Sequence, residues 1–152
     1  MSTLTQIVEM VQHLKSKDER LGWDEYFMSI SILISSRSPC KRLQVGSVIV
    51  KENRILAAGY NGFLPGAPHL SRIRDNHEMA TVHSEMNAIA DCAKRGVDVK
   101  DGTVYITHFP CINCFKAVVA SGIKEIVYHL DYNNDSLVIE IAKENNILIR
   151  KL

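Results

Sequence analysis

The chain has 152 residues, of which 46% are hydrophobic and 23% are charged, and its formal net charge is +1. This length fits one globular domain, and the composition excludes a collagen-like, coiled-coil or largely disordered protein. The near-neutral charge argues against a surface that binds long nucleic acid without sequence preference.

The N-terminal part of the chain is expected to hold two helices. Apolar residues at helical spacing predict the first helix, within a helical extension over residues 1–20 of a single domain that spans residues 1–152; they are Leu4, Ile7, Val8, Val11 and Leu14. Asp24 is a favourable N-cap and predicts the start of the second helix. The side chains that this second helix should bury are Phe27, Ile30, Leu33 and Ile34.

The middle of the chain predicts an antiparallel hairpin and a loop. Residues 45–50 are a β-branched run, residues 51–53 resemble a turn, and residues 54–60 read as a second strand. Residues 61–78 are rich in glycine, proline and polar residues, which is typical of a loop.

The remaining elements alternate between helix and strand. Helices are expected over 83–95, 111–121 and 137–142, and strands over 103–107, 125–128 and 147–149. Because such alternation favours parallel strands covered by helices on both faces, the sequence predicts a three-layer α/β/α domain with a mixed five-stranded sheet.

Targeting signals and disulfide bonds are not expected. No apolar stretch reaches the roughly 20 residues that a membrane span needs, and residues 1–10 lack the pattern of a signal peptide. We therefore expect a cytoplasmic protein with no membrane partner. In a reducing compartment, the spacing of Cys111 and Cys114 indicates metal binding or redox chemistry.

Two short clusters carry the candidate chemistry. Cys111 and Cys114 fall on one face of a first helical turn, and His83 opens the preceding helix. Two thiolates and one imidazole would leave the fourth position of a tetrahedral Zn²⁺ open, as in a catalytic site. Glu85 lies two residues after His83 and can reach that position without binding the metal.

The order His-x-Glu followed by Pro-Cys-x-x-Cys is the signature of zinc nucleobase deaminases. A structural zinc site and a thioredoxin-like redox pair are the alternatives for a Cys-x-x-Cys motif. A structural site needs a fourth protein ligand and has no use for Glu85, so the catalytic reading is favoured.

At these motifs the sequence resembles the deoxycytidylate (dCMP) deaminases of the cytidine deaminase superfamily, including phage and competence-operon members. The matching stretches are residues 23–28, 45–50, 59–62, 82–88 and 107–111. The resemblance implies a cytidine-deaminase-like fold and zinc-dependent conversion of dCMP to dUMP and ammonia, which supplies thymidylate synthesis. It makes Glu85 the proton shuttle and His83, Cys111 and Cys114 the zinc ligands.

The resemblance also implies substrate contacts. Asn61 would contact the nucleotide from the end of the second strand, although an asparagine before glycine is equally typical of a turn. Tyr132 matches a substrate-contacting tyrosine of phage members. The 5′-phosphate needs a cation, and Arg37 is the first choice among three basic residues before the hairpin, which are Arg37, Lys41 and Arg42.

Regulation, a second metal and oligomerisation follow from the resemblance alone. Family members respond to dCTP with Mg²⁺ and to dTTP at a pocket that would involve Gly59, Asn61 and Gly62. Some members carry a second zinc, for which Cys40, His69 and His77 are the residues available here. The family also implies a homo-oligomer, most commonly a hexamer.

Other functions remain open at the level of sequence. A related zinc deaminase could act on a free nucleoside, on guanine or on adenosine in tRNA, and dCTP could be a second substrate. A non-catalytic, zinc-stabilised assembly or competence factor is the alternative from a different class, and Glu85 argues against it.

Overall fold

A five-stranded sheet forms the centre of the protein. The computed structural model describes residues 1–152. The strands of the sheet are β1 (Gly46–Lys51), β2 (Arg54–Tyr60), β7 (Thr103–His108), β8 (Glu125–Leu130) and β9 (Leu148–Lys151), in the order β2-β1-β7-β8-β9. β1 runs antiparallel to β2 and β7, whereas β7, β8 and β9 are parallel. The predicted mixed sheet is therefore confirmed.

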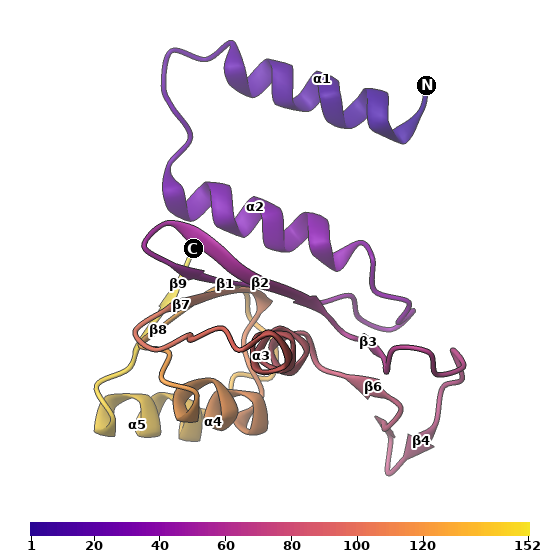
Figure 1. The fold of residues 1–152 in the computed structure, drawn as a ribbon, viewed down its shortest axis with the longest axis vertical. Helices are drawn as coiled ribbons and strands as arrows, with labels where there is room; N and C mark the ends of the chain where they lie inside the picture. The colour runs from indigo at the N-terminus through magenta and orange to yellow at the C-terminus, as the bar shows by residue number, and fades with distance from the viewer.

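Helices cover both faces of this sheet (Figure 1). The five helices are α1 (Thr3–Lys15), α2 (Trp23–Ser35), α3 (Ser84–Arg95), α4 (Ile112–Ala120) and α5 (Ser136–Glu144). α2 packs on one face, and α3, α4 and α5 pack on the other, which confirms the predicted three layers. None of these helices is long and apolar enough to cross a membrane.

Strand alternation divides the core into two clusters. In β1, Val48 and Val50 point toward α2, whereas Ile49 joins the larger cluster beneath α3, α4 and α5. β7 follows the same rule, since Tyr105 faces α2 and Ile106 faces the other side. This alternation fixes which side chains at the end of β7 lie beside the helices that begin there.

The start and the outer face of α2 differ from the prediction. The helix begins at Trp23 and its N-cap is Gly22, so Asp24 lies inside the first turn and the expected Asp24 N-cap was wrong. Leu33 is 55% exposed, so its expected burial was also wrong. The sheet covers only one stripe of α2, and Phe27 and Met28 occupy that stripe.

α1 forms as predicted but lies on the far side of α2 (Figure 1). Ser2 caps it by accepting a hydrogen bond from the Thr5 N–H. None of its residues is buried, and Leu4 is 70% exposed. The helical pattern therefore predicted the helix correctly, whereas its apolar side has no packing partner within the chain.

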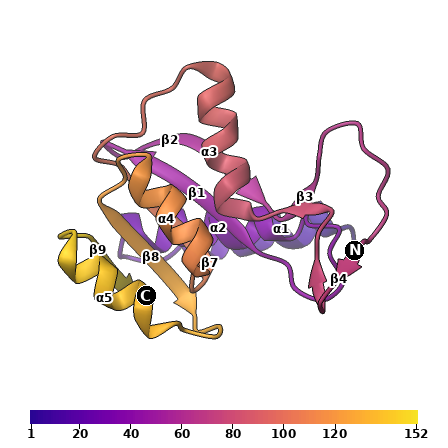
Figure 2. The ribbon, with the colours of Figure 1, turned by 90° about the horizontal axis from the view of Figure 1, so that it is seen from below.

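The segment predicted as a loop over residues 61–78 contains short strands, so the loop prediction was wrong in part. They are β3 (Gly62–Phe63), β4 (Ile73–Arg74), β5 (His77–Glu78) and, just beyond, β6 (Thr81–Val82). β4 and β5 form a hairpin that projects from the body (Figure 2). The Glu78 carboxylate holds this hairpin by accepting hydrogen bonds from the N–H groups of Arg72 (2.9 Å) and Ala80 (2.8 Å).

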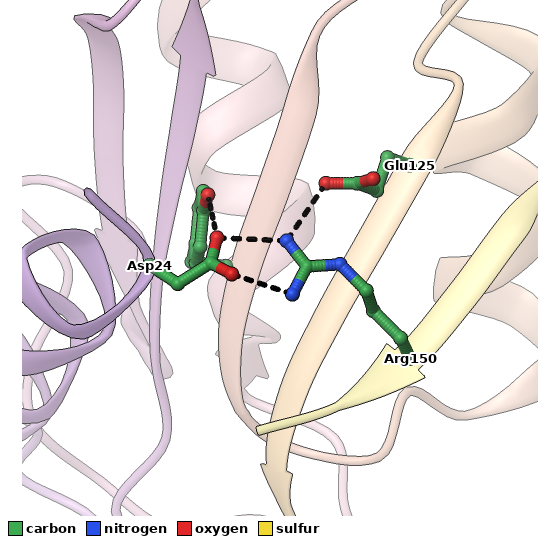
Figure 3. Close-up of polar contacts among 4 residues, drawn as sticks. Asp24, Glu125 and Arg150 are labelled. Atoms are coloured by element: carbon green, nitrogen blue, oxygen red, sulfur yellow. Dashed lines mark hydrogen bonds and ion pairs between the residues drawn. The ribbon is translucent and has the colours of Figure 1, made fainter. Parts of the chain in front are cut away.

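An ion cluster joins the last strand to the second helix (Figure 3). Two nitrogens of Arg150 donate to the two carboxylate oxygens of Asp24 at 2.6 and 2.7 Å, and one of them also donates to Glu125 at 3.2 Å. The Tyr105 hydroxyl donates to Asp24 at 2.7 Å. This cluster connects α2, β7, β8 and β9, so it should stabilise the packing of α2 on the sheet.

We expect this cluster to make stability depend on pH. The hydrogen bonds from Arg150 hold the pKa of Asp24 below its usual value. A lowered folded-state pKa stabilises the protein above the unfolded pKa, and this contribution is lost as the pH falls through the folded pKa. Replacing Asp24 with Asn should therefore lower the free energy of unfolding near neutral pH. The loss should be only about 1–2 kcal/mol, because the partly exposed ion pair is weakened by solvent.

Urea denaturation at neutral and acidic pH measures this effect. The difference between the parent and Asp24→Asn should shrink on acidification, since the parent carboxylate is then protonated. Asp98→Asn is the control, because Asp98 is 73% exposed and lies 3.6 Å from Lys51. Equal pH dependence in parent and Asp24→Asn would contradict the assigned role.

Candidate active site

The candidate site lies where two helices begin. His83 is the N-cap of α3 and directly follows β6, and Cys111 is the N-cap of α4, three residues after β7 ends. The Cys111 sulfur accepts a hydrogen bond from the Cys114 N–H at 3.4 Å. Both helices thus direct their positive N-terminal ends toward the same place, which favours thiolates there.

His83, Cys111 and Cys114 are brought together as potential metal ligands. The Nδ1 atom of His83 lies 3.6 Å from the Cys111 sulfur and 3.4 Å from the Cys114 sulfur. All three ligand atoms lie within 4.8 Å of one another, and no other group of three such residues occurs in the chain. Two sulfurs and one imidazole nitrogen are a donor set that zinc prefers, and they leave one tetrahedral position open.

The electrostatics of these residues favour metal binding. The hydrogen bond from the Cys114 thiol, followed by that from His83, lowers the pKa of Cys111 to about 4. The same contact raises the pKa of Cys114, and the contact with Cys111 raises the pKa of His83. One thiolate is therefore present before a cation arrives, and a cation would displace the remaining thiol proton.

Glu85 is buried beside the ligands. It is only 5% exposed, and the Ser84 hydroxyl donates to its Oε2 atom at 3.0 Å. Burial raises the pKa of Glu85 above its usual value. A carboxyl group with a raised pKa holds a proton more readily than an exposed one and can release it again, as general acid and base catalysis requires.

A cavity of about 400 Å³ opens over the ligands. The residues that line it are Val82, His83, Met86, Cys111, Asn113, Cys114 and Ala117. Its lining is mostly apolar, with polar atoms concentrated at the metal ligands and at Asn113. This composition suits a flat heterocycle that is held by a few polar contacts.

Glycine lets the sheet approach the start of α3. A Cβ atom added to Gly59 of β2 would lie 2.2 Å from the Ser84 carbonyl oxygen and 2.8 Å from the Ala88 nitrogen. Gly59 therefore faces α3 and has no room for a side chain, and its proposed role in an effector pocket stays a prediction. Gly62, whose added Cβ atom would lie 3.0 Å from the Tyr60 ring, packs against that ring.

Asn87 supports the same helix and was not singled out from the sequence. Its side-chain amide donates to the carbonyl oxygens of Tyr60 (2.7 Å) and Val82 (3.2 Å). Asparagine is a poor helix former, so its position one turn after His83 was the signal that could have identified it. These bonds tie α3 to the strands on either side of its N-terminus.

The side-chain amide of Asn61 is hydrogen-bonded to the backbone of the segment that leads into β1. Its Oδ1 atom accepts from the Val45 N–H and its Nδ2 atom donates to the Leu43 carbonyl, both at 2.8 Å. The side chain thereby fixes the approach to β1. This structural role is a long-range one and differs from the turn that its place before glycine suggested, and its substrate contact stays a prediction.

Tyr132 lies beside Arg42, whereas Arg37 was the arginine expected to bind the phosphate. Its hydroxyl accepts from Nη2 of Arg42 at 2.9 Å, and its ring meets the ring of His108 edge to face at 6.0 Å. Arg37 is exposed and makes no hydrogen bond or ion pair through its side chain. Sequence proximity could not separate the two arginines, because the choice depends on how the segment after α2 folds back toward β8.

Cys40, His69 and His77 do not form a second cluster of metal ligands. The His69 ring stacks on Phe63 at 4.9 Å, and Nδ1 of His77 is hydrogen-bonded to the Asp75 carbonyl at 2.7 Å. The two histidines thus make separate local contacts, His69 with β3 and His77 within the projecting hairpin, and the hypothesis of a second zinc has no geometric support.

Known proteins are similar to this chain in sequence. The chain is 38% identical over 138 residues to ComE operon protein 2 of Bacillus subtilis (strain 168), a match that covers 88% of this chain and 73% of that protein. It is 37% identical over 131 residues to human deoxycytidylate deaminase, covering 80% of this chain and 72% of that enzyme.

A solved structure has the same fold. The dCMP deaminase of cyanophage S-TIM5, determined in complex with dCMP and dUMP, matches with a TM-score of 0.79 at 28% identity, over 88% of this chain and 99% of that one. Residues 21–130 match the model of the cytidine and deoxycytidylate deaminase zinc-binding region, and this range contains all three ligands and Glu85. The chain therefore belongs to the cytidine and deoxycytidylate deaminase family.

Proposed function

We propose that this protein is a zinc-dependent deaminase that converts dCMP and water into dUMP and ammonia. The observation that carries the proposal is the buried Glu85 carboxyl group beside His83, Cys111 and Cys114, three potential ligands that line a largely apolar cavity. A structural metal site would not need a buried carboxyl group that is kept apart from the ligands.

The chain's own residues supply the proton transfers. When bound, zinc supplies Lewis-acid activation of a water molecule. The Glu85 carboxylate accepts a proton from the attacking water and donates it to N3 of cytosine, which makes C4 electrophilic, and the water oxygen bonds to C4. Glu85 then carries the second proton of that water to the exocyclic amino group, the C4–N bond breaks, and ammonia leaves. The Ser84 hydroxyl orients the carboxylate through its hydrogen bond to Oε2.

We infer that Arg42 and Tyr132 bind the 5′-phosphate. Tyr132 follows β8, and Arg42 donates to its hydroxyl, so both lie at the carboxyl end of the parallel strands. Open α/β sheets bind ligands at this edge. A second nitrogen of Arg42 donates to the Asn76 carbonyl at 3.4 Å, a weak contact that a phosphate oxygen could replace.

Replacing Arg42 with Met should lower kcat/KM for dCMP by about 10- to 100-fold, because it removes a charge-assisted hydrogen bond to phosphate. The same change should leave kcat/KM for deoxycytidine nearly unaltered. Steady-state rates of ammonia release on dCMP, CMP, deoxycytidine and dCTP measure both effects. Arg54→Met, an exposed position on β2, is the control.

If Arg37→Met, and not Arg42→Met, lowers kcat/KM for dCMP alone, Arg37 is the residue that binds the phosphate. Equal efficiency of the parent protein on dCMP and deoxycytidine would replace the nucleotide deaminase by a nucleoside deaminase.

Supply of dUMP for thymidylate synthesis, control by dCTP with Mg²⁺ and by dTTP, a cytoplasmic location and assembly into a hexamer are further parts of this proposal. They rest on family resemblance.

A further inference from the structure

His108 is a polar side chain at the end of β7, close in the chain to the candidate metal ligand Cys111. It ends β7, pairs with Leu130 of β8, and lies three residues before Cys111. Its ring is half-buried and meets the Tyr132 ring edge to face at 6.0 Å. His108 therefore belongs to the same sheet edge as Tyr132 and its partner Arg42.

The hydrogen bonds of Thr107 determine where the His108 ring carries its proton. The Thr107 oxygen accepts from the Gly46 N–H at 3.1 Å and lies 2.8 Å from Nδ1 of His108. Thr107 is only 3% exposed, and its hydroxyl makes no other hydrogen bond. If Nδ1 carried the proton, the buried hydroxyl proton of Thr107 would have no acceptor, at a substantial cost. Thr107 therefore donates to Nδ1, and the ring proton lies on Nε2.

The charge state of His108 agrees with this assignment. Burial, followed by the proximity of His129, lowers the pKa of His108 below its usual value. The ring is therefore neutral near pH 7, with one acceptor nitrogen that is already used and one N–H donor that is free.

The surroundings of this donor suit an anion. Arg42 donates to the Tyr132 oxygen, so the hydroxyl proton of Tyr132 is also free to donate. Asp131, the carboxylate next to Tyr132 in the chain, is paired with Lys151 at 2.5 Å. Arg42, Tyr132 and His108 thus supply three donors at this end of the strands, and the neighbouring carboxylate of Asp131 is already paired.

We propose that His108 binds an oxygen of the substrate's 5′-phosphate through its Nε2–H, and that Thr107 is the positioning residue that holds this tautomer. The inference rests on the proposed nucleotide deaminase activity. It assigns two residues, neither of which belongs to the metal site, to the choice between nucleotide and nucleoside.

The experiment compares His108→Leu with His108→Gln on dCMP and deoxycytidine, using the zinc-loaded protein. Leucine removes the donor, whereas glutamine carries an N–H at about the place of Nε2. His108→Leu should lose about 10- to 100-fold in kcat/KM for dCMP and little for deoxycytidine, and His108→Gln should recover most of the loss. His13→Gln on the exposed helix α1 is the control.

Thr107 is tested separately by nuclear magnetic resonance of ¹⁵N-labelled histidine. In the parent and in Thr107→Ser, Nε2 of His108 should carry the proton, and inorganic phosphate or dUMP should shift its resonance. Thr107→Val should raise the population of the other tautomer and weaken dUMP binding. The parent resonance gives a result even if Thr107→Val does not fold.

The outcomes separate the two proposals. If the parent protein does not deaminate dCMP, the proposed function fails. If it does, but His108→Leu prefers dCMP to deoxycytidine as strongly as the parent, the role of His108 is refuted. A parent ring protonated on Nδ1 would refute the role of Thr107.

Discussion

Replacing Glu85 with Gln is expected to reduce dCMP deamination by at least about 10²- to 10⁴-fold while the protein keeps its zinc. Glutamine has nearly the same size and can still accept the Ser84 hydrogen bond at its amide oxygen, but it cannot exchange a proton with water or cytosine. Glu85 is not one of the three grouped ligands, so the metal content should remain at one per chain.

Metal analysis, thermal unfolding and single-turnover rates of the Glu85→Gln protein check this together. Glu140→Gln is the matched control, because Glu140 is exposed on α5, away from the cavity. Turnover within about tenfold of the parent would show that another group moves the protons. Loss of zinc in Glu85→Gln would mean instead that Glu85 is itself a ligand.

Replacing Gly59 with Ala should destabilise the protein and weaken zinc binding at the same time. The added Cβ atom would lie 2.2 Å from the Ser84 carbonyl oxygen, and neither backbone can move without separating β2 from α3. Overpacking of this kind costs about 1–3 kcal/mol or more in the free energy of unfolding. Because His83 directly precedes Ser84, the shift should also displace one zinc ligand.

Urea denaturation gives the change in stability, and competition with a chelator gives the change in zinc affinity. Gly22→Ala is the control, since the nearest atom to its added Cβ, Oε2 of Glu25, is 3.7 Å away. A Gly59→Ala protein with the parent's stability and zinc affinity would show that the contact between β2 and α3 is not needed to hold the site.

Local patterns in the amino-acid sequence were enough to predict the helices, the strands of the main sheet and the candidate metal ligands, but not the short strands between Gly62 and Val82. Periodic apolar patterns and β-branched runs are local signals, and they predicted the three helices that follow the hairpin and all five strands of the main sheet. The candidate metal ligands could also be predicted, because Cys111 and Cys114 form a local motif at a helix start and His83 lies at the start of the preceding helix. The last strand ended two residues later than predicted, at Lys151.

The long-range contacts could be identified only in the tertiary structure. Asp24 looked like a helix cap, but its carboxylate pairs with Arg150, which lies 126 residues away in the chain. Arg42 rather than Arg37 contacts Tyr132. Position 59 requires glycine, because the Ser84 carbonyl leaves no space for a Cβ atom. No local pattern encodes these pairs. They depend on how the sheet register and the helix packing bring distant segments to within hydrogen-bond or van der Waals distance.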